Sequence, residues 1–110
     1  MPRWTVRLSD PAENDFDDIV AFTAERFGAR QAITYQSTLK LALNALAAGP
    51  EVRGSSNRDD VGDGLRSLHV ARKGRGGRHL IIYREMPGRT IEVLRILHDA
   101  MDLAQHMAVD

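Results

Sequence analysis

Basic side chains are concentrated in one part of this chain. Residues 64–84, GLRSLHVARKGRGGRHLIIYR, contain six Lys or Arg and no acidic residue, although the whole sequence has 15 basic and 15 acidic residues. Such a cluster could bind a nucleic acid, a reacting phosphate or an acidic protein surface. A net charge near zero argues against a general nucleic-acid binder, which is usually basic overall. The sequence therefore favours a protein partner and no sequence-specific nucleic acid.

The Gly-rich stretch RKGRGGR, residues 72–78, carries the densest charge of this segment. It lacks the spacing of a phosphate-binding Walker loop, and no helix is predicted to follow it. Two interpretations stay open. The stretch is either a hairpin tip with glycines for tight backbone turns and charges for solubility, or a mobile basic finger that engages an acidic partner.

Histidines and acidic residues could transfer protons or bind a metal. His98, Asp99 and Asp102 lie close in the sequence, but their spacing fits no standard zinc pattern. The chain has no Cys, and we expect no metal and no cofactor. We interpret His98 as a strand-end residue that hydrogen-bonds Asp99 or Asp102. His69 and His79 are expected to be half-exposed and to pair across a hairpin.

Length and composition predict a single globular domain over residues 1–110. The hydrophobic and charged fractions, 43% and 27%, are ordinary for such a domain. The first residues, MPRWTVRLSD, have no apolar core of a signal peptide, and no stretch approaches the length of a membrane span. We expect a cytoplasmic protein with no membrane association, which the lack of Cys also fits.

The N-terminal half predicts one strand and two helices. Trp4, Val6 and Leu8 alternate with polar residues, as in a half-buried strand. Asp10 is the expected N-cap of a helix over about residues 11–27, with Glu13 completing a capping box. Gly28 should end this helix in the left-handed conformation. The apolar stripe of the helix consists of Ala12, Phe16, Ile19, Val20, Thr23 and Phe27.

A second helix follows directly and stops at Gly49-Pro50, so the two helices should form an antiparallel hairpin. Tyr35 belongs to the apolar stripe of this second helix. Residues 50–64, PEVRGSSNRDDVGDG, lack periodicity and are predicted to be a loop.

Three strands are predicted to finish the domain, around Leu68–Val70, at residues 78–85 and at residues 90–98. In the last strand, Ile91, Val93 and Leu97 should face one way and Leu94 and Ile96 the other, which places this strand inside the sheet. Arg66, Arg84 and Arg95 could pair with Glu85 or Glu92 across strands. The tail, DAMDLAQHM, could add a short helix.

The predicted fold class is therefore α+β. An N-terminal strand, a helical hairpin and a three-stranded antiparallel meander follow one another in the order β-α-α-β-β-β, with a short C-terminal helix. The meander should carry the helical hairpin on one face.

Four segments are similar to blocks of a known family. They are LSDPAENDFDDIVAFTAERFG at 8–28, GLRSLHV at 64–70, GRHLIIYR at 77–84 and VLRILHDAMD at 93–102. In this order and spacing they resemble the ParE branch of the RelE/ParE superfamily of bacterial toxins. The resemblance extends from Val6 to about His106.

This resemblance implies the toxin of a type II toxin–antitoxin system that inhibits DNA gyrase by binding. A ParD-like antitoxin would neutralise it by laying a C-terminal segment across the helical hairpin and the sheet edge. The residues expected to contact partners are Arg66, Arg72, Lys73, Arg75, Arg78, Arg84, Arg95 and His98.

Two alternatives remain open. The other branch of the superfamily cuts ribosome-bound mRNA, a reaction that needs a base, an acid and cations around the phosphate. Arg66 and Arg78 could supply the cations and His98 the base, but the tail AQHMAVD lacks the Tyr often found there in that branch. The binding inhibitor is therefore preferred to the endonuclease. A third reading is an inactive family member retained as an antitoxin partner.

Overall fold

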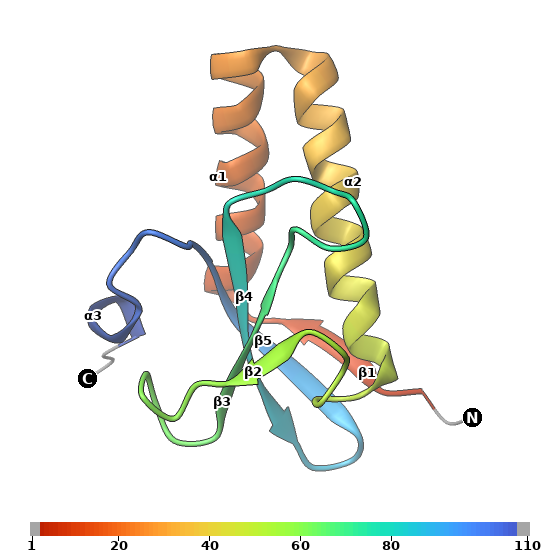
Figure 1. The fold of residues 1–110 in the computed structure, drawn as a ribbon, viewed down its shortest axis with the longest axis vertical. Helices are drawn as coiled ribbons and strands as arrows, with labels where there is room; N and C mark the ends of the chain where they lie inside the picture. The colour runs from red at the N-terminus through yellow and green to blue at the C-terminus, as the bar shows by residue number, and fades with distance from the viewer. Residues whose placement is uncertain (1–2, 108–110) are drawn as a thin grey trace.

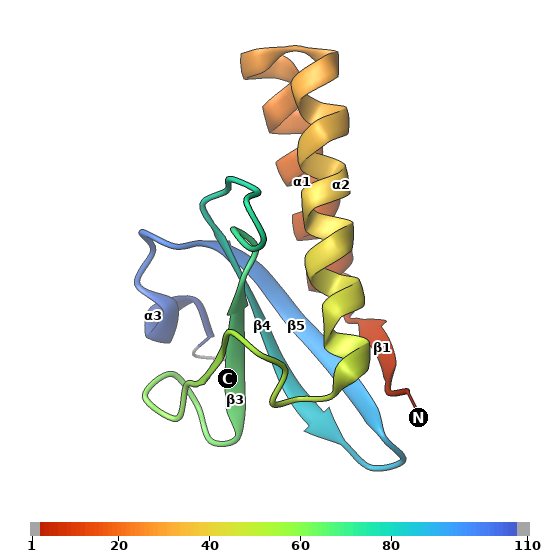
Figure 2. The same ribbon diagram turned by 45° about the vertical axis from the view of Figure 1, so that its right-hand side comes forward.

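The computed structural model describes residues 3–107, and these form a two-layer α+β fold (Figure 1). Two long helices stand side by side against one face of a sheet and project beyond it (Figures 1 and 2). The elements in chain order are β1 (Thr5–Leu8), α1 (Asp10–Phe27), α2 (Ala29–Ala45), a 3-10 turn (Leu46–Ala48), β2 (Ser55–Asn57), β3 (Leu65–His69), β4 (His79–Met86), β5 (Thr90–His98) and α3 (Leu103–Met107). The predicted order of strand, helical hairpin and antiparallel meander is confirmed, as is the short C-terminal helix.

The first helix begins one residue earlier than its sequence predicts. Ser9 is the N-cap, and its hydroxyl accepts a hydrogen bond from the Ala12 N–H at 3.1 Å. Asp10 is therefore the first helical residue, and the predicted capping box with Glu13 is wrong. Ser9 prevails because its N–H and hydroxyl also donate to the carbonyls of Val93 and Leu94, both at 2.9 Å, which ties the helix start to β5.

Gly28 separates the two helices, as predicted, but its backbone is not that of a left-handed helix. Its φ is 95° and its ψ is 166°, a positive-φ conformation that favours glycine. The chain therefore reverses within one residue, and α2 returns antiparallel to α1 as the expected hairpin.

The sheet has five strands in the order β1-β5-β4-β3-β2. The segment predicted as a loop contains β2, which pairs antiparallel with β3 through Ser55 opposite Leu68. Three residues of Ser and Asn have little intrinsic strand preference, so this strand exists because β3 offers it an edge. β1 pairs in parallel with β5, and β5 lies inside the sheet, as expected.

A β-bulge in β5 changes which side chains face the helices. Ile82 pairs with Arg95 and Tyr83 pairs with Val93, so Leu94 has no partner of its own on β4. Beyond this extra residue the alternation reverses. Ile96 joins Ile91 and Val93 in the core under the helices, and Leu97 joins Leu94 on the opposite face. The predicted faces of Ile96 and Leu97 are therefore exchanged.

Helix α1 covers the edge of β5 that β1 leaves open. β1 pairs only as far as Val93. Further along, the Asp15 carboxylate accepts the Ile96 N–H at 2.9 Å and binds the Arg95 guanidinium at 2.7 and 2.9 Å. Backbone groups at a sheet edge need partners, and a side chain of α1 supplies one here.

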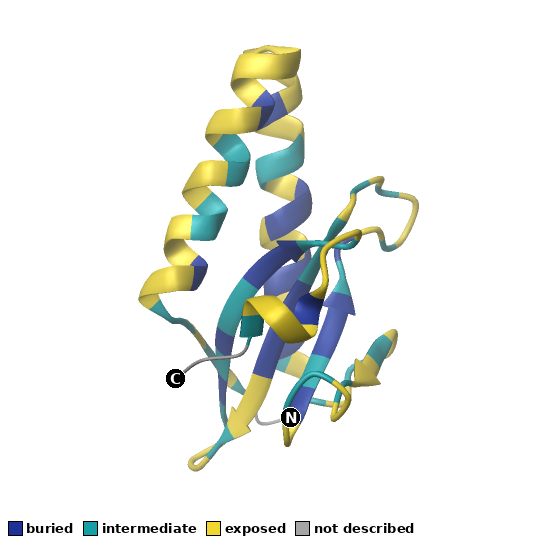
Figure 3. Ribbon diagram, turned by 90° about the vertical axis from the view of Figure 1, so that its left-hand side faces the viewer, coloured by how far each residue is buried: buried dark blue, intermediate teal, exposed yellow. Residues whose placement is uncertain are grey.

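Two apolar cores lie on the two faces of the sheet. The larger lies under the helices and includes Leu39, Leu46, Ile81 and Tyr83, which are fully buried. The smaller lies on the opposite face, where α3 crosses in front of the strands (Figure 3) and Leu103 packs on the sheet. No helix within residues 3–107 has the length and apolar composition to cross a bilayer.

Candidate functional site

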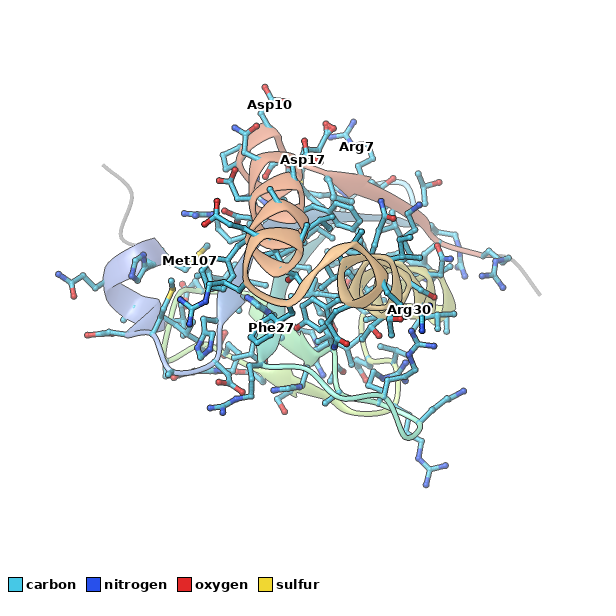
Figure 4. All side chains as sticks on the ribbon, turned by 90° about the horizontal axis from the view of Figure 1, so that it is seen from above. Arg7, Asp10, Asp17, Phe27, Arg30 and Met107 are labelled. Carbon is cyan, nitrogen blue, oxygen red and sulfur yellow. The ribbon has the colours of Figure 1, made fainter. Side chains whose placement is uncertain are left out.

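A groove lies between the helical hairpin, the β3–β4 connection and the ends of β4 and β5. We call it the histidine groove, and its volume is about 530 Å³. Seen from above, Phe27 is on the side of α1 toward the β3–β4 connection, whereas Asp10 and Asp17 lie on the other side (Figure 4). The lining residues are Asp18, Ile19, Phe22, Thr23, Phe27, Gln31, Tyr35, Gly76, Gly77, Arg78, His79 and His98.

Three rings meet at the base of the groove. The Tyr35 hydroxyl lies 2.7 Å from His79 Nδ1, and it accepts the Arg78 N–H at 3.2 Å. The rings of His79 and His98 meet edge to face with centroids 5.5 Å apart. The base therefore takes one side chain from each of α2, β4 and β5, and α2 is distant in the sequence from the two strands.

His79 is uncharged at neutral pH. Burial, together with the nearby His98 ring, lowers the pKa of His79 from its ordinary 6.5 to about 4. The imidazole is therefore a neutral hydrogen-bonding group in the physiological range, and it lacks the second proton that an imidazolium could donate as a general acid.

Asp99, just after β5, joins His69 to Arg78, which is one of the predicted site residues. Its carboxylate accepts the His69 Nε2–H at 2.9 Å and the Arg78 Nε–H at 3.1 Å. These two donors, the Arg78 guanidinium first, lower the pKa of Asp99 to about 2. Because Asp99 stays ionised, it fixes Arg78 beside the groove.

The histidines do not pair as the sequence suggested. His98 Nδ1 accepts the Ala100 N–H at 3.1 Å and lies 3.6 Å from Asp99, so the expected carboxylate hydrogen bond is replaced by a backbone one. In the register of the sheet, His79 lies opposite His98 and His69 lies opposite Leu80. The predicted pairing of His69 with His79 is wrong, because the register places Leu80 opposite His69 and the His79 carbonyl accepts the Val70 N–H.

Three of the predicted partner-binding arginines have local partners on or near the sheet. Arg84 pairs with Glu92 across β4 and β5 at 2.8 Å, as expected. Arg95 instead binds Asp15. Arg66 donates to the Pro50 carbonyl and the Ser55 hydroxyl, both at 2.8 Å, because β2 brings these groups beside β3. The expected pairing of Arg66 and Arg95 with glutamates is therefore wrong.

The β3–β4 connection is fixed against α2 through its own cations. Arg75 donates to the Thr38 hydroxyl at 2.9 Å and to the Thr34 carbonyl at 3.0 Å. Arg72 donates to the Arg53 carbonyl at 3.1 Å. Lys73, exposed at the tip with φ 51°, has no hydrogen-bond or ion-pair partner among the described residues. Hydrogen bonds of Arg72 and Arg75 thus hold the two sides of the connection, and its tip exposes the cation of Lys73.

The structure brings together only part of the predicted catalytic set. Arg78 and His98 meet at the histidine groove, through Asp99 and His79. Arg66 pairs with Tyr83, four residues along β4 from His79, which corresponds to about 13 Å at 3.3 Å per residue. Its guanidinium is also occupied. Arg66 therefore does not share a site with the other two.

Sequence reasoning missed several groups that build the groove. Phe27 was placed in the buried stripe of α1, but it is 68% exposed, and Phe22 is 57% exposed. Tyr35 was expected in the core of the helical hairpin, yet its hydroxyl reaches the base of the groove. The signal available in the sequence was the pair of aromatic residues at 22 and 27. Two large apolar side chains that are exposed near a helix end often mark a binding site.

The fold is that of a solved toxin–antitoxin component. The chain superposes on a structure described as the chromosomal ParDE toxin–antitoxin system from P. aeruginosa with a TM-score of 0.69 and 19% identity, covering 86% of this chain and 95% of that one. At this identity the likeness concerns the fold alone.

Sequence comparison defines the family. A family model described as the ParE toxin of the type II toxin–antitoxin system parDE matches residues 6–103. Toxin ParE1 of Caulobacter vibrioides is 32% identical over 101 residues, covering 92% of this chain and 95% of that protein. Toxin ParE1 of Mycobacterium tuberculosis is 31% identical over 100 residues, covering 91% and 94%. The chain belongs to the ParE family of toxins of type II toxin–antitoxin systems.

Proposed function

We propose that this protein inhibits DNA gyrase by binding it and that a ParD-like antitoxin neutralises the inhibition in the cytoplasm. The observation that carries the proposal is the family match, which spans residues 6–103 and so includes the hairpin, the sheet and the basic segment together. A binding inhibitor needs a shaped surface and no catalytic group.

The distribution of cations supports binding at the β3–β4 side of the molecule. Lys73 is exposed and unpaired among the described residues, and the Arg78 side chain is 69% exposed. Arg66 and Arg95 are less available, since each makes two short hydrogen bonds inside the fold. Of the partner-binding residues expected from the sequence, Lys73 and Arg78 are therefore the first to test.

A ribosome-dependent mRNA endonuclease is the second candidate, and one observation favours it. Arg78, His79 and His98 line the same groove as the Tyr35 hydroxyl, so a cation and two imidazoles stand close together. The separation of Arg66 from this set weakens the candidate, because the phosphorane charge would then be met by one arginine.

Purified protein added to a gyrase supercoiling assay tests the proposal. We expect loss of supercoiling or accumulation of cleaved DNA at a toxin concentration near that of gyrase. The variant Lys73→Glu should weaken this effect about tenfold or more, since a charge contact at an interface is reversed. Lys40→Glu, an exposed change on α2, is the matched control and should inhibit as the unmodified protein does.

The same preparation is added to translating ribosomes. Cleavage of mRNA there, with gyrase unaffected, would replace the proposal with the endonuclease. If both activities are absent while the protein still binds its antitoxin, the inactive family member is the correct reading.

A further inference from the structure

The histidine groove has an apolar wall that is largely exposed, although the Arg26 guanidinium lies over the Phe22 ring, 5.7 Å from its centroid. Phe22 and Phe27 stand exposed on α1 and line the groove together with Ile19. Large apolar side chains that are gathered at the surface of a small protein often mark an interaction site. An apolar group of a binding partner would therefore fit this wall.

The base of the groove offers hydrogen-bond donors. His98 Nδ1 accepts a backbone N–H, so the ring carries its proton on Nε2. The Tyr35 hydroxyl, which already accepts the Arg78 N–H, donates to His79 Nδ1 in the arrangement that satisfies all these groups. His79 then also carries its proton on Nε2.

Both Nε2–H groups are accessible. Neither makes a hydrogen bond within the described residues, yet no fully buried polar side-chain atom among those residues lacks a partner. The two nitrogens must therefore be in contact with solvent. Since both rings line the groove, their free donors are available to a bound group.

The wall opposite the helices is made of free backbone. Gly76 and Gly77 belong to no helix or strand, and their N–H and C=O groups make no hydrogen bond with the described residues. Unpaired peptide groups in an accessible segment can pair with another polypeptide. Gly76 is open, since a Cβ there would meet nothing within 4 Å, whereas Gly77 packs closely on Val70 and Tyr35.

We propose that the histidine groove seats a segment of a partner polypeptide in which a carboxylate lies next to a bulky apolar side chain. The apolar side chain packs on Phe22 and Phe27. The carboxylate accepts hydrogen bonds from the Nε2–H groups of His79 and His98, beside the outer face of Arg78. The proposal rests on the proposed function as a partner-binding toxin.

Charge in the groove favours a carboxylate over a nucleic-acid phosphate. Among the described residues that line it, Arg78 is the one permanent cation and Asp18 the one acidic side chain. Binding to nucleic acid depends on several cations that neutralise several phosphates. Two imidazole N–H donors and one guanidinium, itself paired with Asp99, can hold a single carboxylate set in an apolar segment but not a run of phosphates.

The test uses the full-length protein and two synthetic peptides, acetyl-Ala-Leu-Glu-Phe-Ala-amide and the same peptide with Gln in place of Glu. Binding is followed at pH 7 by the NMR signals of backbone amides and histidine rings. We expect the Glu peptide to bind at least tenfold more tightly than the Gln peptide. Its addition should shift the Gly76 and Gly77 amides and the Nε2 signals of His79 and His98.

Variants separate the groove from the rest of the surface. Phe27→Ser and Arg78→Gln should each weaken binding of the Glu peptide at least fivefold. Ile33→Ser is the matched control, because Ile33 is 67% exposed on α2 and does not line the groove. Equal binding of the two peptides, shifts elsewhere on the surface, or stronger shifts at these signals with a single-stranded oligonucleotide would overturn the inference.

The gyrase assay on the same preparation distinguishes the two proposals. Gyrase inhibition without selective peptide binding removes the groove inference and leaves the function in place. Selective peptide binding without gyrase inhibition supports the groove and removes gyrase as the target.

Discussion

Three histidines are oriented by the same kind of contact. In His69 and His98, Nδ1 accepts the N–H of the residue two positions later, and in His79 it meets the Tyr35 hydroxyl. Each ring is thereby left with a donor on Nε2. His69 uses this donor on Asp99, whereas His79 and His98 keep theirs for the groove. A backbone N–H thus sets the proton position in His69 and His98, and the Tyr35 hydroxyl sets it in His79.

The low pKa of His79 predicts a loss of stability in mild acid. The folded state binds the proton with a pKa of about 4, against 6.5 for an ordinary histidine. Between these values the unfolded chain binds more protons, so the free energy of unfolding should fall as the pH falls from 6.5 to 4. His79→Gln should make this decline shallower. Urea unfolding at several pH values measures both slopes.

Asp99 provides an internal check on that experiment. Its pKa of about 2 lies below its ordinary 3.8, so its contribution is present above pH 4 and is lost only as the pH falls toward 2. Because the Asp99 charge also raises the pKa of His79, the Asp99→Asn variant should show a slope between pH 6.5 and 4 that is no shallower than that of the wild type. If the His79→Gln and wild-type curves run parallel in that window, His79 is not the group that titrates.

At the scale of elements, the β3–β4 connection is docked on α2 by close contact as well as by Arg75. A Cβ at Gly77 would lie 2.6 Å from Val70 Cγ2 and 2.8 Å from the Tyr35 hydroxyl. Gly77 is therefore required by the approach of the connection to the helix, although its φ is not unusual. At Gly76, by contrast, a Cβ would meet nothing within 4 Å.

These two neighbouring glycines make a matched pair of variants. Gly77→Ala should lower the free energy of unfolding by about 1–3 kcal/mol, because the added methyl overpacks the contact with Tyr35. Gly76→Ala should change it by less than about 0.5 kcal/mol. Chemical denaturation measures both, and similar losses from the two variants would show that the connection does not pack on α2 as described.

The whole molecule has two cores of unequal size on the two faces of one sheet. Leu39 is fully buried between the helices and the sheet, and Leu103 holds α3 on the opposite face. A cavity costs most where the surroundings cannot collapse into it. Long helices packed on a five-stranded sheet cannot readily move, whereas a five-residue helix at the surface can.

The same substitution in the two cores should therefore have different effects. Leu39→Ala should lower the free energy of unfolding by about 3–5 kcal/mol, and Leu103→Ala by about 2 kcal/mol or less. Equilibrium unfolding in urea measures both. Equal losses would mean that α3 is as much a part of the main core as α2.

Local patterns were enough to predict most of the elements. The three- and four-residue spacing of apolar side chains predicted α1 and α2, and the alternation of apolar residues predicted β1, β3, β4 and β5. These patterns are local because a helix or strand must present one face to a core. The concentration of charge in residues 64–84 was also visible, although most of those cations bind inside the fold.

The sequence by itself therefore determined the order and kind of the elements other than β2, because the spacing of apolar residues within each segment indicates a helix or a strand. The tertiary structure alone decided the rest. The bulge at Leu94 exchanges the faces of Ile96 and Leu97, β2 forms on an edge that β3 provides, and Tyr35 reaches His79 across 44 residues. These features depend on contacts between distant segments, and no local pattern records which segments will meet.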